Sequence, residues 1–156
     1  MIYIIEVTLK PEFIDHHGEH IRHDGTALGI KRLPKVRFYQ LYKLEGEIIS
    51  QEIKIIAEKL LHDPITENFR IISSGEKNFK DEFNSIEVWL KPGVTDTVAE
   101  SVSKAVKDLS ILEKLVINTG QKYVFEGKAE TSVLKQIAEK LLVNSLVQRY
   151  TLNKGK

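Results

Sequence analysis

The chain has 156 residues, of which 42% are hydrophobic and 29% are charged, and its formal net charge is +1. This length and composition are typical of one or two small globular domains, and the near-neutral charge argues against a nucleic-acid or anionic membrane surface as partner. The sequence contains no cysteine, which excludes disulfides, thiolate nucleophiles and cysteine-bound metal centres and favours an intracellular protein.

The first half of the chain predicts five elements in the order strand, helix, long strand, helix, strand. Pro11 should end the first strand, Asp15 should cap the first helix, and Gly29 should end that helix. The long stretch is either one bent strand or two strands broken near Tyr39-Gln40, and Ser50 is expected to cap the second helix. The expected ranges are a strand over 2–9, a helix over 15–28, an extended stretch over 33–44, a helix from 50 to the Asp63-Pro64 pair, and a strand over 69–72.

The second half repeats this order after a polar linker. Thr95 or Asp96 should cap its first helix, Gly120 is placed to bend its long strand, and Glu130 or Thr131 should start its second helix. The expected ranges are a strand over 85–90, a helix over 96–109, an extended stretch over 115–125, a helix from 130 or 131, and a strand over 146–152. The apolar stripe of the first helix is strong in this half (Val98, Val102, Ala105, Val106, Leu109) and thin in the other (Ile14, Ile21, Ala27, Leu28).

The two halves are copies of one module at a fixed offset of 81 residues. The hexapeptide Ile56–Leu61 recurs as Ile137–Leu142, and residues 4–71 match residues 85–152 without a gap at 21 of 68 positions. Such self-similarity indicates a duplication. Each copy is then a βαββαβ or βαβαβ unit of the α+β class, with an antiparallel sheet that carries its helices on one face.

A module of this size has a small core and exposed sheet edges, so fusion should give each copy a permanent neighbour. We expect a first module over 1–73, a linker over 74–84 and a second module over 85–156. Together they should form an intramolecular pseudo-dimer, with the two sheets joined edge to edge or packed face to face. The sequence leaves both arrangements open.

All five histidines lie in the first copy, and His16, His20 and His23 share one face of its first expected helix. Histidines one turn apart can bind zinc. However, the aligned residues of the second copy are Thr97, Ser101 and Lys104. We therefore expect no metal site, and expect this face to be exposed to solvent or to a partner.

The pattern Lys10-Pro11 followed by Asp15 recurs in the second copy as Lys91-Pro92 followed by Asp96. Proline and aspartate at these positions are typical of a strand end and a helix cap, which accounts for the pattern. The lysines also place ammonium groups beside helix N-termini, where anions bind. The sequence shows no glycine-rich phosphate loop and no nucleophile–base motif, so we expect neither catalytic residues nor a cofactor.

Three short motifs, in this order, resemble the PurS family, the small subunit of phosphoribosylformylglycinamidine (FGAM) synthase in purine biosynthesis. They are Leu-Lys-Pro with a following Asp-x-x-Gly, Val-Arg with Gly-Gln or Gly-Lys in the long strand, and Ala-Glu-Lys-Leu-Leu before the last strand. The first copy keeps Lys10, Pro11, Asp15, Gly18, Gly29, Val36, Arg37 and Pro64, with Glu12 and Tyr39-Gln40 in place of glycine and Gly-Lys. The second copy keeps Lys91, Pro92, Gly93, Val94, Asp96, Gly120 and Asn144, with Ala99 and Gln121 in place of glycine and lysine.

This resemblance implies a non-catalytic subunit of a glutamine-dependent, ATP-consuming ligase. PurS-like proteins are single-copy modules that dimerise and bridge a PurL-like synthetase subunit and a PurQ-like glutaminase subunit, so that ammonia passes between their active sites. A tandem chain would stand in for the dimer. The resemblance further implies a cytoplasmic protein without a cofactor and without a nucleic-acid or membrane partner, and leaves self-association open.

The candidate partner-interface residues are Lys10, Asp15, His16, His20, His23, Arg37, Gln40, Lys91, Asp96, Gly120 and Gln121. An alternative is a tandem ACT-like regulatory module, which binds an amino acid or nucleotide, because Asp15-His16-His17-Gly18 is similar to the Asp-x-x-Gly turn of that class. An RNA-binding domain is disfavoured by the neutral charge and by the absence of the aromatic pair of that family.

Overall fold

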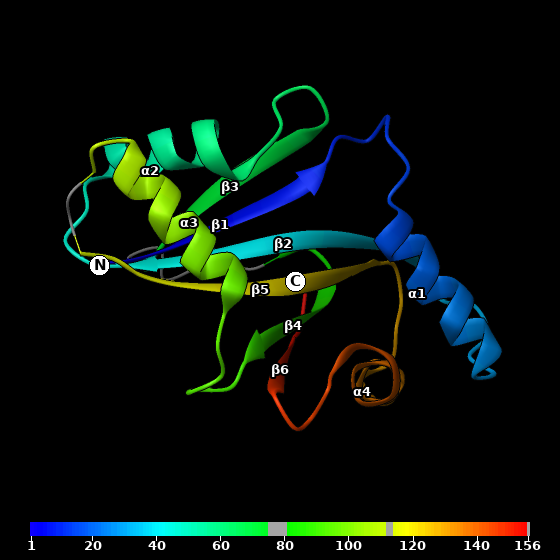
Figure 1. The fold of residues 1–156 in the computed structure, drawn as a ribbon. Helices are drawn as coiled ribbons and strands as arrows, with labels where there is room; N and C mark the ends of the chain where they lie inside the picture. Colours follow the sequence, from blue (N-terminus) through cyan, green and yellow to red (C-terminus); the bar gives the residue numbers. More distant parts are fainter. Residues whose placement is uncertain (75–80, 112–113, 156) are drawn as a thin grey trace. The chain divides into compact units, whose positions relative to one another are not determined.

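The computed structural model describes residues 1–74, 81–111 and 114–155. Its elements follow the same order twice along the chain (Figure 1). The first repeat contains β1 (Ile2–Leu9), α1 (His16–Ala27), β2 (Lys35–Glu45), α2 (Ser50–Ile56), the π-helical turn η1 (Ala57–Leu61) and β3 (Glu67–Ser73). The second contains β4 (Asn84–Leu90), α3 (Thr97–Asp108), β5 (Val116–Glu126), α4 (Thr131–Ile137), the π-helical turn η2 (Ala138–Leu142) and β6 (Gln148–Asn153). The predicted α+β class is confirmed, while most of the expected linker, residues 75–80, lies outside the described residues.

The strands follow the hydrogen-bonded order β3-β1-β2-β5-β4-β6. β1 pairs antiparallel with β2 and β3, so that Val7 lies opposite both Gln40 and Phe69, and β4 pairs antiparallel with β6. The two repeats therefore share one sheet, which corresponds to the edge-to-edge arrangement of the two alternatives. Each long stretch forms one continuous strand, although residues 33 and 34 lie outside β2.

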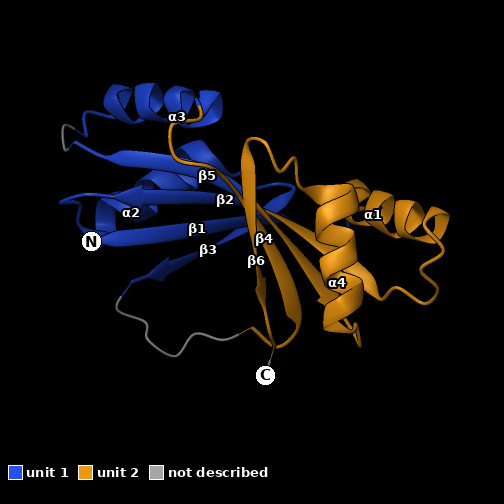
Figure 2. Cartoon of the chain, turned by 90° about the horizontal axis from the view of Figure 1, so that it is seen from below, with its two compact units in different colours: residues 1–13, 40–78, 95–120 blue, residues 14–39, 79–94, 121–156 orange. Residues whose placement is uncertain are grey.

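The chain forms two compact units, and these units do not follow the repeats (Figure 2). Unit 1 comprises residues 1–13, 40–78 and 95–120, and unit 2 comprises residues 14–39, 79–94 and 121–156. The segments 14–39 and 95–120 lie at the same place in the two repeats, since they differ by the repeat offset of 81. Each segment holds a first helix and the first half of a long strand. The repeats have therefore exchanged equivalent segments, and β2 and β5 each contribute one half to each unit.

Unit 1 has an apolar core on one face of its strands. Alternate residues of β1 point into this core, as the two-residue period of a strand requires, and both α2 and α3 pack on it. The core residues include Tyr3, Ile5 and Val7 of β1, Leu44 of β2, Ile53 and Ile56 of α2, and Ala99 and Val106 of α3. Because α3 comes from the second repeat, the core of unit 1 depends on both repeats.

Unit 2 is built in the same way with the roles of the repeats reversed. Its core joins α1 and the start of β2, from the first repeat, to β4, β5, α4 and η2 of the second. The buried residues are Ile21, Val36, Ile86, Val88, Tyr123, Phe125, Leu134, Ile137 and Ala138. Neither core is complete within one repeat.

The prediction of a thin apolar stripe on the first helix is wrong for every residue except Ile21. Ile14 and Leu28 are exposed, and the buried residues of α1 are Gly18, Ile21 and Gly25. These three lie at i, i+3 and i+7, so two glycines and one isoleucine form the contact face. In α3 the aligned positions are Ala99, Val102 and Val106, and Val98, expected in the stripe, is exposed.

The second helix of each repeat begins without a side-chain cap. Ser50, the expected cap, lies inside α2, and the capping position is Ile49, which makes no side-chain capping bond. The repeated hexapeptide ends each of these helices in a π-helical turn, η1 or η2. Such turns usually occur as single insertions in α-helices. None of the helices in the described part of the chain is long and apolar enough to cross a membrane.

Candidate functional site

Asp15 and Asp96 tie the first helix of each repeat to the long strand that follows it. One carboxylate oxygen of Asp15 accepts a hydrogen bond from the backbone N–H of Gly18 at 2.9 Å, and the other accepts from Phe38 N–H at 2.8 Å. Asp96 accepts in the same way from Ala99 and Thr119, at 2.9 and 2.7 Å, and also from the Thr119 hydroxyl. Both aspartates thus act as helix caps that also fix the register of helix on strand, which accounts for them structurally.

Gly18 has a steric role in this arrangement. A Cβ atom at Gly18 would lie 1.8 Å from the carbonyl oxygen of Val36, so the helix backbone contacts the strand backbone directly. The Asp-x-x-Gly turn, which is similar to that of ACT-like modules, is therefore explained by a cap and a close approach without any ligand.

Lys10 and Lys91 make equivalent hydrogen bonds. The ammonium group of Lys10 donates to the carbonyl oxygen of Pro64 at 2.8 Å, and that of Lys91 donates to Ser145 at 2.5 Å. Each lysine thereby holds the turn that follows the π-helical segment. An ammonium group has three N–H donors, so this contact leaves donors for an anionic group of a partner.

The predicted exposure of the histidine face is seen in the structure, where His16, His20 and His23 are all exposed. His16, His17 and His20 line an open groove of about 340 Å³ together with Ile21, Tyr123, Leu141 and Leu142. His17 stacks on Phe38 with ring centroids 4.2 Å apart, and His20 Nε2 lies 3.2 Å from a carboxylate oxygen of Asp24. In the described residues, no group of three or more histidine, aspartate or glutamate side chains is arranged to hold a metal ion.

The long-strand candidates lie in separate places. Arg37 donates through Nε to Glu126 at 2.9 Å in unit 2, and this hydrogen bond raises the pKa of the Arg37 guanidinium. Gln40 donates through Nε2 to the carbonyl oxygen of Gly120 at 2.9 Å in unit 1. Gln121, the next residue, is half-buried. The structure therefore brings Gln40 and Gly120 together, but does not gather all the candidates into one site.

Two buried charged residues were missed by the sequence reasoning. Glu6 is paired with Arg70 in unit 1, and Lys122 lies 2.5 Å from Asp81 and 5.7 Å from the ring centre of Tyr39 in unit 2. Both occupy strand positions that alternate with core residues, so they lie on the sheet face opposite the apolar core. A charge flanked by apolar strand residues, such as Glu6 between Ile5 and Val7, was the signal that could have identified them.

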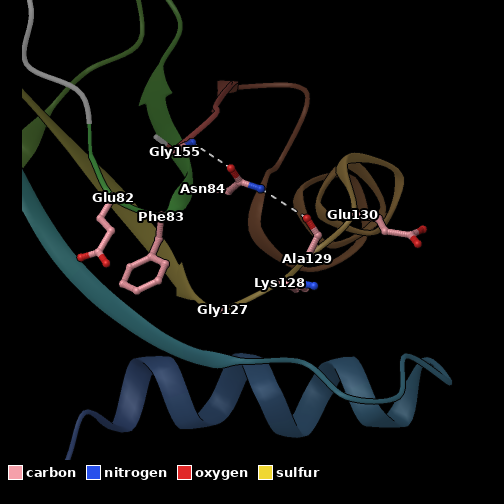
Figure 3. Close-up of a pocket in the computed structure, with 8 residues that line it drawn as sticks. All are labelled: Glu82, Phe83, Asn84, Gly127, Lys128, Ala129, Glu130 and Gly155. Carbon is pink, nitrogen blue, oxygen red and sulfur yellow. Dashed lines mark hydrogen bonds between the residues drawn. The ribbon is translucent and has the colours of Figure 1, made fainter.

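A second open pocket of about 740 Å³ lies in unit 2 near the C-terminal end of the described chain (Figure 3). Asn84 bridges its walls, because its side chain donates to the carbonyl oxygen of Ala129 and accepts from Gly155 N–H. In Figure 3 the carboxylates of Glu82 and Glu130 point away from each other. The polar groups of this pocket do not converge as those of a small-molecule site usually do.

Together, these features define a duplicated α+β scaffold in which the motif residues mainly fix helices and turns. A comparison with models of known protein families identifies the family to which this scaffold belongs. The model of PurS, phosphoribosylformylglycinamidine (FGAM) synthase, matches the chain twice, over residues 3–74 and 84–155. The chain belongs to the PurS family, as a tandem duplication of two PurS-like modules, which associates it with FGAM synthase and purine biosynthesis. None of the curated proteins matches the chain significantly.

Proposed function

We propose that this chain is a non-catalytic subunit of FGAM synthase that bridges a PurL-like synthetase subunit and a PurQ-like glutaminase subunit. The assembly would convert formylglycinamide ribonucleotide, ATP and glutamine to the amidine, ADP, phosphate and glutamate. The chain would hold the two enzymes so that ammonia released by the glutaminase reaches the synthetase, in the cytoplasm. The observation that carries this proposal is the double match to the PurS model in one chain.

The exchange of segments supports the idea that one chain replaces a dimer. Each compact unit contains one first helix, one second helix and strands from both repeats. A single-module protein could complete such units only by pairing with a second copy. The duplicated chain supplies both copies covalently, so it needs no second copy to complete either core.

The asymmetry between the repeats supports binding to two different proteins. The first helix of unit 2 presents exposed His16, His20 and His23, while the aligned residues of α3 in unit 1 are Thr97, Ser101 and Lys104. We propose the histidine face as part of one partner interface. Lys10, Lys91, Arg37 and Gln40 are proposed to border the interfaces, and Asp15 and Asp96 to support them from within.

Reconstitution with purified synthetase and glutaminase subunits tests this proposal. Amidine formation is measured with glutamine or with an ammonium salt as the nitrogen source, with and without the chain. We expect the chain to increase the glutamine-supported rate and to leave the ammonium-supported rate nearly unchanged, because free ammonia needs no transfer. Equal glutamine-supported rates with and without the chain would contradict the proposal.

A matched pair of variants locates the interface in the same assay. Replacing His16, His20 and His23 by serine should lower the apparent affinity of the chain for the reconstituted enzyme. Replacing Thr97, Ser101 and Lys104 by alanine is the control, since these residues hold the same helix positions in the other repeat. Equal effects of the two variants would contradict a specific role for the histidine face.

A further inference from the structure

The turn after each π-helical segment presents one large apolar side chain to solvent. Ile65 is 75% exposed and Leu146 is 84% exposed, and they are the two most exposed large hydrophobic residues in the described part of the chain. They hold the same position in the two repeats, since they are 81 residues apart. We call these residues the turn-tip residues.

Among the large hydrophobic residues in the described part of the chain, no other position is exposed in both repeats. Ile49 and Val116 are 59% and 56% exposed, and their counterparts in the other repeat are the charged residues Glu130 and Lys35. Isolated exposed apolar side chains are common on protein surfaces and need no explanation. A pair kept at one position in both copies, after the copies have come to differ at most other positions, does need one.

Both turn tips are held in a defined conformation. Ile65 N–H donates to the side chain of Asp63 at 2.8 Å, and Leu146 N–H donates to that of Asn144 at 3.1 Å. The backbone N–H groups of Asp63 and Asn144 donate in turn to the side chains of Glu67 and Gln148, both at 2.8 Å. Lys10 and Lys91 hold the neighbouring carbonyl groups. A side chain fixed in this way loses little conformational freedom on binding, which favours a contact residue.

The charge around the two turn tips differs. The turn of Ile65 carries the carboxylates of Asp63 and Glu67 beside Lys10, whereas the turn of Leu146 carries the neutral amides of Asn144 and Gln148 beside Lys91. The hydrogen-bond geometry is the same, but the second turn lacks two negative charges. An apolar contact at Leu146 is thus suited to a partner surface with carboxylates, and the contact at Ile65 is not.

We propose that Ile65 and Leu146 are docking residues, each of which inserts into an apolar socket on a protein partner, and that the socket for Leu146 is bordered by acidic side chains. This inference rests on the proposed function, since it takes the partners to be the synthetase and glutaminase subunits. The two turns differ in charge, so the sockets belong to different partner surfaces. Each unit contributes one docking residue.

The test measures binding of full-length variants to the purified synthetase and glutaminase, separately and together, by light scattering and titration. The variants are Ile65→Ser, Leu146→Ser and the double variant, with Val98→Ser and Val116→Ser as controls at other exposed apolar positions. We expect a loss of at least about tenfold in affinity for each single turn-tip variant, in line with central apolar contact residues, and little change for the controls. Unchanged melting temperatures show that all variants fold.

Salt dependence provides the second readout. Binding through Leu146 should weaken as the ionic strength rises, and Lys91→Met should reduce that dependence, because Lys91 faces the acidic border of its socket. If the unaltered chain binds neither enzyme, the proposed function fails. If it binds both, and the double variant binds as tightly as the unaltered chain, the docking proposal alone is overturned. A double variant that only loses self-association, with binding to the enzymes intact, would also overturn it.

Discussion

Gly18 and Ala99 occupy the same position in the two first helices, but their surroundings set different limits. At Gly18 an added methyl group would meet a backbone carbonyl, which cannot move as a flexible side chain can. Ala99 carries that methyl group and is buried in the core of unit 1. The same cap and the same turn can therefore be built with either residue, and the distance between helix and strand decides which one fits.

This difference predicts that each exchange destabilises the chain, but for a different reason. Gly18→Ala should cost about 3 kcal/mol, the upper range for overpacking. Alanine's better helix propensity offsets about 1 kcal/mol of this cost, so the free energy of unfolding should fall by about 2 kcal/mol. Ala99→Gly should cost about 1 kcal/mol from helix propensity, together with a small loss of apolar burial. Urea unfolding measures both. A Gly18→Ala variant as stable as the unaltered chain would show that the helix does not contact Val36 directly.

Tyr42 and Tyr123 hold the same position in the two repeats, and their pKa values predict how the stability of the chain depends on pH. Burial raises the pKa of both phenols, and for Tyr123 the Asp15 carboxylate adds to the effect. The unfolded chain releases these protons near the usual tyrosine pKa of about 10, whereas the folded chain keeps them to higher pH. Their contribution to stability is therefore complete below about pH 10 and is lost as the pH rises toward the folded-state pKa.

The double variant Tyr42→Phe/Tyr123→Phe should consequently lose less stability between about pH 9 and pH 11 than the unaltered chain. The measurement is the urea midpoint as a function of pH. Ile14→Leu serves as a control that changes an exposed residue without removing a titrating group. If the urea midpoints of the unaltered chain and of the double variant change in parallel with pH, the burial of the phenols is contradicted.

At the scale of elements, the sequence predicted the strands and helices well, but not what they contact. The ranges of β1, α1 and α3 agree with expectation within about two residues, because caps and strand ends leave local signals. The contact face of α1 was missed because its buried positions are glycines, which an apolar pattern does not count. The missing cap at Ser50 arises because that residue lies one position inside the helix.

The candidate site was also predictable only in part, because the sequence does not show which distant residues come into contact. The repeated Lys-Pro and Asp positions were identified from the sequence, and the structure shows that each makes the same contact in both repeats. Glu6 and Lys122 were missed, because a buried charge on the rear face of a strand depends on partners far along the sequence, such as Arg70 and Asp81. The exchange of segments was likewise not visible, since the sequence gives the repeats but not their pairing.

The exchanged first helices predict how separated repeats behave. A fragment of residues 1–74 has no α3 to cover its own strands, and a fragment of residues 81–156 has no α1. Mixed together, the two fragments should form a heterodimer in preference to either homodimer, because α1 packs in a core made mostly of second-repeat residues and α3 packs in a core made mostly of first-repeat residues. Native mass spectrometry of the mixture gives the populations. Stable folded monomers of each fragment would contradict the exchange.

At the scale of the whole molecule, duplication turns a symmetric scaffold into one with two distinguishable ends. In a dimer of identical modules, any change on one surface appears on both. In the fused chain, histidines occur in the first repeat and not in the second, and the turn at Leu146 has amides where the turn at Ile65 has carboxylates. Such asymmetry suits a protein placed between two different enzymes, and a symmetric dimer lacks it.

The central claim is that one chain takes the place of two PurS modules in a synthetase assembly. The most direct test is the subunit composition of the complex formed with PurL-like and PurQ-like subunits in the presence of glutamine and ATP, measured by native mass spectrometry. Single-module PurS proteins would occupy each such site as two copies. The account predicts a single copy of this chain at the same site. A complex that contains two copies of the chain per site, or no complex at all, would contradict it.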